Sequence, residues 1–141
     1  MSDQQRLRTM ISFHFYTGSR LMQRMYRPYF DEWNITYPQY LVLLCLWEKD
    51  GQTIADLSTP LDLDSGTLSP LLKRMEASGY VRRQADHKDY RRVLFFLTQR
   101  GRKLKAQASE METEVTAMLG LDVDDLKAIS EIMAKINPVI E

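Results

Sequence analysis

The 141-residue sequence has little cysteine and histidine and no long apolar run. A single cysteine, Cys45, excludes an internal disulfide framework and a cysteine-rich zinc site, and two histidines argue against a histidine-based metal site. No stretch approaches the roughly 18 to 20 apolar residues of a membrane span, and the N-terminal segment has no run suited to a signal peptide. We therefore expect a soluble, cytoplasmic protein without a metal or a membrane partner.

The motifs of small enzymes are also missing. The sequence shows no set of nucleophile, base and orienting group, no metal-ligand spacing and no glycine-rich phosphate loop. We therefore predict that the protein is not an enzyme and has no catalytic residue and no cofactor. Its length and its 44% hydrophobic content suit one domain with a core, and the chain is too short for two ordinary domains.

Charge is distributed unevenly along a chain whose formal net charge is zero. Residues 64–105 carry 11 Lys and Arg against 4 Asp and Glu, and the remaining residues are acidic by the same margin. A basic segment in a neutral chain indicates one surface that faces a polyanion. The alternative is a solvated basic face without a partner.

Hydrophobic spacing predicts the order of the elements. The first helix is expected to bend near Gly18, and Pro60 is expected to stop the third. Two β-prone runs separated by a polar loop predict a hairpin. The predicted helices cover residues 4–32, 36–51, 53–60, 64–79 and 99–119 and a last segment from 122 onward, and the predicted strands cover residues 80–84 and 92–98.

Three helices followed by a hairpin is the order of a winged helix-turn-helix. In that fold the second helix of the pair enters the major groove and the hairpin, or wing, reaches the flanking minor groove. The predicted fold is therefore mainly α with a small β-hairpin wing. We place the DNA-binding lobe at about residues 36–100 and terminal dimerisation helices at about 1–33 and 101–141.

The predicted helix at residues 64–79 has two different faces. Leucines and Met75 form an apolar stripe, while short polar side chains at the start let the backbone approach bases. N-capping is the alternative role of Ser65 and Thr67. Pro70 limits where the helix can begin, because it has no N–H to donate. The predicted DNA-facing residues are Ser65, Thr67, Ser69, Pro70, Lys73 and Arg74.

The loop of the hairpin is rich in basic residues. Lys88, Arg91 and Arg92 suit a wing, because a guanidinium gains from the negative potential of a narrow minor groove. Asp89 precedes Arg91 by two residues, and we expect it to orient that arginine. An ordinary exposed turn aspartate is the alternative.

Three segments resemble a known family. "TYPQYLVLLCLWE", "LDSGTLSPLLKRMEASGYVRR" and "DYRRVLFFLT" are similar to the corresponding segments of MarR-type regulators, closest to the organic-hydroperoxide-resistance branch. The resemblance spans about residues 10–105 and implies a homodimer that binds a pseudo-palindromic operator in double-stranded DNA, usually as a repressor. It implies the DNA-facing residues Ser65, Thr67, Pro70 and Arg74, the wing-tip residue Arg91 and its partner Asp89.

The terminal helices also favour a dimer on their own evidence. Both carry apolar stripes, although the central helices and the hairpin already suffice for a compact lobe. A second copy of the chain would cover those stripes, and two identical reading helices would then need a two-fold symmetric site. Folding back into a monomeric bundle is the alternative.

In the peroxide-sensing branch a reactive cysteine lies near the start of the first helix. The resemblance places Ser12 of "SFHFY" at that position, as a natural residue or an engineered one, and serine is not oxidised to a sulfenic acid. We therefore expect a small phenolic or apolar effector between the dimer helices and the lobe, with plain packing as the alternative. The predicted effector pocket comprises Ser12, Tyr16, Met22, Tyr26 and Tyr37.

Cys45 lies in "LVLLCLW", where we expect burial to raise its pKa and make it inert. The predicted function is a homodimeric transcriptional regulator, a repressor released by an effector. Two alternatives remain: a regulator that senses oxidation through Cys45 or a Cys-to-Ser variant at Ser12, and a winged-helix interaction module that does not bind DNA.

Overall fold

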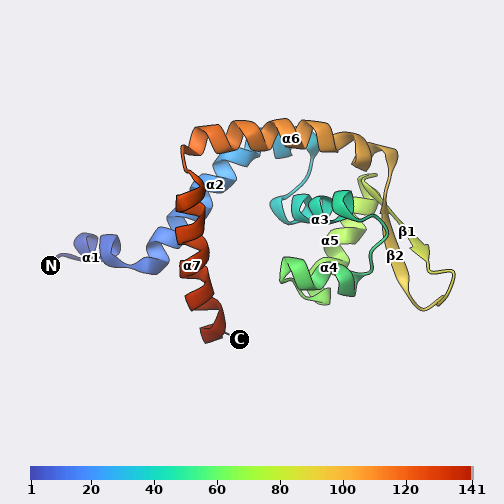
Figure 1. Ribbon diagram of the computed structural model, residues 1–141, viewed down its shortest axis with the longest axis horizontal. Coiled ribbons are helices and arrows are strands. Elements are labelled where there is room, and N and C mark those ends of the chain that lie inside the picture. Colours follow the sequence, from blue (N-terminus) through green and yellow to red (C-terminus); the bar gives the residue numbers. More distant parts are fainter. Residues whose placement is uncertain (141) are drawn as a thin grey trace. The chain divides into compact units, whose positions relative to one another are not determined.

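The computed structural model describes residues 1–140 and consists of two compact units, residues 1–108 and the residues from 109 onward. Glu141, the last residue of the predicted C-terminal segment, lies outside the described residues. The fold is mainly helical with one two-stranded antiparallel hairpin, which confirms the predicted fold class (Figure 1). The elements are α1 (Asp3–Thr9), α2 (Ile11–Trp33), α3 (Tyr37–Glu48), α4 (Ile54–Leu61), α5 (Ser65–Ala77), β1 (Val81–Ala85), β2 (Val93–Leu97), α6 (Gln99–Leu119) and α7 (Val123–Ile140).

The N-terminal helical region is divided at Met10, and its second part continues through Gly18. Met10 has an extended backbone, with φ −85° and ψ 119°, and separates α1 from α2. Helix α2 then runs through Gly18 without interruption, and the bend expected there stays a prediction. A glycine inside a helix costs only about 1 kcal/mol relative to alanine, which a helix of 23 residues can absorb.

Helix α4 does not stop at Pro60. It begins with a capping box, in which the Thr53 hydroxyl accepts from the Asp56 N–H at 3.1 Å, and it ends at Leu61. The prediction that Pro60 terminates this helix was therefore wrong by one residue. In the last turn the missing N–H removes only one intrahelical hydrogen bond, and the chain leaves the helix at Asp62, in the left-handed region with φ 53°.

Helices α3, α4 and α5 gather with the hairpin into one lobe (Figure 1). Its core contains side chains with at most 1% of their surface exposed, among them Leu43 of α3, Leu57 of α4 and Leu72 of α5. The strands pair in a register that sets Val81 opposite Leu97. The wing loop, residues 86–92, therefore extends from one end of a short hairpin whose other end is buried in the lobe.

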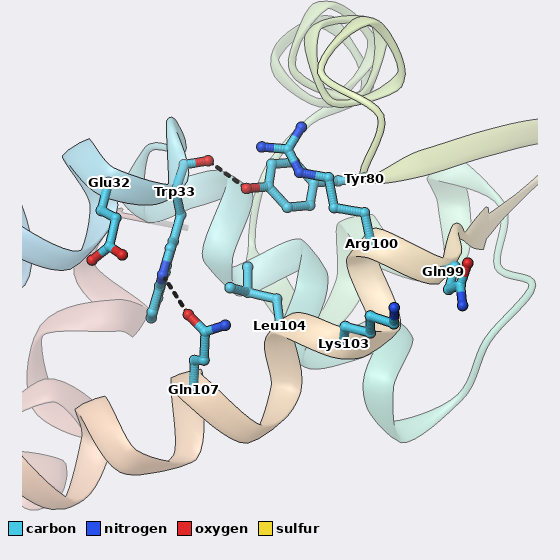
Figure 2. Close-up of a pocket in the computed structure, with 8 residues that line it drawn as sticks. All are labelled: Glu32, Trp33, Tyr80, Gln99, Arg100, Lys103, Leu104 and Gln107. Carbon is cyan, nitrogen blue, oxygen red and sulfur yellow. Dashed lines mark hydrogen bonds between the residues drawn. The ribbon is translucent and has the colours of Figure 1, made fainter.

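Tyr80, between α5 and β1, joins the lobe to α2 and α6 (Figure 2). Its phenol donates to the main-chain carbonyl of Trp33, and the indole N–H of Trp33 donates to Gln107 at 3.1 Å. The guanidinium of Arg100 lies 4.3 Å from the centre of the Tyr80 ring and donates to the carbonyl of Ser78. These contacts fix the end of α2 and the start of α6 against the segment that connects α5 to β1.

Candidate nucleic-acid interface

Asp64 caps the N-terminus of helix α5. Its carboxylate accepts a hydrogen bond from the backbone N–H of Thr67 at 2.7 Å, and this bond is the main reason that the pKa of Asp64 is lowered. Neither Ser65 nor Thr67 caps the helix, so N-capping is excluded as the role of either hydroxyl. The helix begins five residues before Pro70, so the proline lies inside it. Sequence reasoning missed Asp64, although Asp directly before a helix is a common capping signal.

The two faces of α5 are arranged as predicted. Leu68, Leu71, Leu72 and Met75 are buried, at 4% exposure or less, and the side chains between them point outward. At 100° per residue, Pro70 and Lys73 lie on the side of the helix opposite the buried stripe. The residues predicted to face DNA are all exposed: Ser65, Thr67, Ser69, Pro70, Lys73 and Arg74.

These six residues do not all share one edge of the helix. Ser69 lines a groove shared with the wing. Arg74 lies on the other flank and lines a pocket with Asn34 and Thr36 of the α2–α3 connection. The exposed face of α5 is therefore broad, with one flank toward the wing and the other toward the start of α3.

At the wing tip, Asp89 holds Arg91. The Asp89 carboxylate accepts from the Arg91 backbone N–H at 3.0 Å and from its Nε at 3.3 Å. The arginine side chain is nevertheless 93% exposed, so its guanidinium is held at one end and open to a partner. The contact between Asp89 and Arg91 is the one that the sequence predicted.

Arg92 has a different carboxylate partner, which sequence reasoning missed. Its guanidinium lies 3.6 Å from Asp86, whose carboxylate also accepts from the backbone N–H of Lys88 at 3.0 Å. The backbone N–H of Asp86 donates to the carbonyl of Arg92 at 2.9 Å and closes the loop. An aspartate that accepts from the N–H two residues later is a common turn signal, and Asp86 could have been found from it.

A groove of about 480 Å³ lies between the start of α4, helix α5 and the wing. Arg83 of β1, which the sequence did not single out, lines it and pairs with Glu76 of α5 at 3.3 Å. A hydrogen bond with Thr53 is the main cause of the lowered pKa of Asp56, and the charge of Arg92 contributes. The residues that line the groove are Thr53, Ile54, Ala55, Asp56, Ser69, Arg83, Arg91, Arg92, Val93 and Phe95.

The predicted effector residues fall into two groups along α2. Tyr26 is buried and its ring centre lies 5.4 Å from that of Tyr37, while Met22 is half-buried one turn before Tyr26. Ser12 and Tyr16 are exposed. Ser12 precedes Tyr26 by 14 residues of helix, about 21 Å at 1.5 Å per residue. A single chain therefore brings Met22, Tyr26 and Tyr37 together and leaves the other two apart from them.

Cys45 is half-buried, whereas the sequence predicted a core position. Helix α3 buries Val42, Leu43 and Leu46, and Cys45 lies at the edge of that face. Its pKa is raised as expected, mainly because burial disfavours the thiolate and secondarily because of the charge of Glu48.

Comparisons with known proteins identify the family to which this arrangement of helices and wing belongs. Residues 35–93 match the MarR family model. The chain is 42% identical over 135 residues to the HTH-type transcriptional regulator TtmR of Methylorubrum extorquens, covering 96% of this chain and 69% of TtmR. It is 40% identical over 131 residues to the organic hydroperoxide resistance transcriptional regulator of Bacillus subtilis, covering 93% and 89% of the two chains.

The structure also resembles solved structures of this kind. Reduced AbfR of Staphylococcus epidermidis bound to DNA superposes with a TM-score of 0.82 and 34% identity, over 99% of this chain and 98% of that one. No helix in the described part of the chain is long and apolar enough to cross a membrane. The chain therefore belongs to the MarR family and is a DNA-binding transcriptional regulator.

Proposed function

We propose that the protein is a cytoplasmic, homodimeric repressor that binds a pseudo-palindromic operator in double-stranded DNA and is released by a small effector. The observation that carries the proposal is the pairing of an exposed recognition face on α5 with a carboxylate-held, exposed arginine at the wing tip. That combination suits simultaneous contact with a major groove and the minor groove beside it.

The proposed DNA contacts divide by chemistry. On α5, the hydroxyls of Ser65, Thr67 and Ser69 and the cations Lys73 and Arg74 face base edges and phosphates, with Pro70 as an apolar contact. In the wing, Arg91 enters the minor groove, with Asp89 fixing its direction. Lys88 and Arg92 contact phosphates on either side of it.

A homodimer is supported by apolar side chains that a single chain leaves in water. In the first unit they lie on α1 and the first half of α2, where Ile11 is 71% and Tyr16 60% exposed. In the second unit they include Leu126, at 64%, and Ile129, at 47%, on α7. Monomeric proteins rarely expose so many large apolar side chains. The same apolar side chains on a second copy of the chain would bury them.

The proposed effector is a small phenolic or apolar molecule. The aromatic rings of Tyr26 and Tyr37 next to Met22 would supply an apolar wall, and Ser12 and Tyr16 would join it only if the partner chain contributed them. Such a molecule can release DNA only by binding the non-binding conformer more tightly than the binding one.

Oxidation of Cys45 is the weaker alternative for the signal. Solved structures of the related AbfR include reduced, overoxidised and disulfide forms, so thiol chemistry occurs among proteins similar to this one. In this chain the only cysteine is half-buried and its pKa is raised, both of which slow oxidation.

DNA footprinting upstream of the gene, followed by binding measurements at several salt concentrations, tests the proposal. We expect protection of a two-fold symmetric site and a steep loss of affinity with salt. Arg91→Ala should weaken binding and reduce the slope of the logarithm of the binding constant against the logarithm of the salt concentration by about one per lobe. Arg24→Ala, at an exposed position on α2, is the control and should change neither quantity. Salt-independent or undetectable duplex binding would favour a protein-interaction module instead.

A further inference from the structure

Every arginine that lines the groove between α5 and the wing is paired with its own carboxylate. Arg91 pairs with Asp89, Arg83 pairs with Glu76 at 3.3 Å, and Arg92 pairs with Asp86 at 3.6 Å. The last two pairs connect different parts of the interface. The pair of Arg83 with Glu76 links β1 to α5, and the pair of Arg92 with Asp86 closes the base of the wing loop.

The position of the groove determines what passes over it. A helix in the major groove and a wing in the adjacent minor groove must straddle the sugar-phosphate strand that separates the two grooves of the duplex. The space between α5 and the wing is this groove, with Ser69 on the helix side and Arg92 on the wing side. One backbone strand of bound DNA would therefore lie against Arg83 and Arg92.

We propose that Glu76 and Asp86 are specificity-determining residues. Each carboxylate weakens the binding of its arginine, Arg83 or Arg92, to the phosphates of unrelated DNA. Each also holds its arginine at the place where the backbone strand of a matched operator passes. This inference rests on the proposed function and deepens it, because it concerns the same interface. In this role each carboxylate acts through its arginine and not through contact with a base.

The physical basis is a competition between two kinds of anion for the same guanidinium. Arg83 and Arg92 are about half exposed, at 51% and 54%, so water weakens their ion pairs and a phosphate can compete for them. A phosphate placed at random must displace the carboxylate or tolerate its repulsion. A strand in the right register can meet the free edge of a guanidinium that stays held by its partner, as bidentate arginine contacts allow.

The neutral isosteres Glu76→Gln and Asp86→Asn separate charge from geometry. In Asp86→Asn the side-chain oxygen still accepts from the Lys88 N–H, so the turn is retained while the charge is lost. Glu32→Gln is the matched control, because Glu32 lines the cleft beside Tyr80 and not this groove, and it changes the net charge equally (Figure 2).

Affinities are measured on the duplex selected by footprinting and on a shuffled duplex of the same composition. A partly exposed ion pair is weak, so each isostere should raise affinity for the shuffled duplex by about threefold to tenfold. The slope of the logarithm of the binding constant against the logarithm of the salt concentration should steepen by about one per lobe. Operator affinity should rise less, so the ratio of operator to shuffled affinity should fall. Glu32→Gln should leave this ratio unchanged.

Three results would overturn the inference. The first is an unchanged ratio in both isosteres, and the second is an equal loss of affinity for both duplexes with normal thermal unfolding, which indicates a structural role alone. The third is the same fall in ratio for Glu32→Gln, which assigns the effect to net charge. If the wild-type protein itself does not prefer the selected duplex, the proposed function fails as well, so the two failures can be told apart.

Discussion

The phenol of Tyr80 donates a hydrogen bond to the main-chain carbonyl of Trp33, 47 residues earlier in the chain. The carbonyl belongs to the last residue of α2, where a helix has no N–H of its own to offer. A side chain from the segment between α5 and β1 thus supplies a hydrogen-bond donor to a carbonyl at the C-terminus of α2. The contact ties the segment that follows the proposed reading helix to the end of the proposed dimerisation helix α2.

Tyr80→Phe should lower the free energy of unfolding by about 1 to 2 kcal/mol, because it leaves a buried carbonyl without its donor. Tyr80 is 2% exposed, so water cannot easily replace the lost hydroxyl. Urea denaturation measures the change. Tyr90→Phe is the control, since Tyr90 is 83% exposed and its substitution should have no effect. Equal unfolding midpoints for the two variants would contradict the role given to the Tyr80 hydroxyl.

Gly101→Ala should destabilise the protein by about 1 to 3 kcal/mol, since overpacking forces the backbone to move. A Cβ at this position would lie beside the main-chain carbonyl oxygen of Tyr80, an atom that cannot rotate away. Gly18→Ala is the opposite case, because a Cβ there meets nothing within 4 Å, and it should stabilise α2 by about 0.5 to 1 kcal/mol. Thermal unfolding of both variants checks the difference in sign.

The Asp64 cap should make stability depend on pH in the acid range. Its pKa is lowered in the folded protein, mainly by the Thr67 N–H, and lies near 3.9 in an unfolded chain. The contribution is therefore present above about pH 4 and is lost as the pH falls through the lower folded value. Asn is also a good cap, so Asp64→Asn should match the wild type at pH 7 and lose less stability between about pH 5 and pH 3. Parallel pH profiles for the two proteins would contradict this.

Cys45 should react slowly with alkylating agents at neutral pH. The raised pKa lowers the fraction of thiolate, and partial burial limits access, so the rate should be well below that of a free cysteine and should keep rising above pH 9. Mass spectrometry of iodoacetamide-treated protein gives the rate. If Cys45 reacts as fast as free cysteine at pH 7, and peroxide releases DNA from the wild type but not from Cys45→Ser, the oxidation-sensing alternative is correct.

The sequence predicted those parts of the structure that depend on neighbours along the chain. The apolar stripe of α5 follows from helical spacing, and the contact between Asp89 and Arg91 follows from two residues in one turn. The pair of Glu76 with Arg83 could not be predicted in the same way, because it depends on how β1 turns back on α5. The break at Met10 has no sequence signal of its own, since methionine is a good helix former.

The predicted effector pocket shows a similar limit. Aromatic residues on one helix can be counted from the sequence, but their distance along the helix axis separates them. Tyr26 and Tyr37 come together only because the α2–α3 connection folds back on α2. In the proposed dimer Ser12 would join them from the second chain, and hydrophobic spacing does not position that chain.

The capping of α5 by Asp64 has a consequence for how such a regulator can change over time. Because the residue that starts the helix is not one of those proposed to read DNA, Ser65 and Thr67 can be exchanged without removing the start of the helix. In the proposed interface, capping of the helix and contact with DNA thus fall on different residues of one short segment. If the proposed contacts hold, a new operator can be acquired by substitutions that leave the stability of the lobe nearly unchanged.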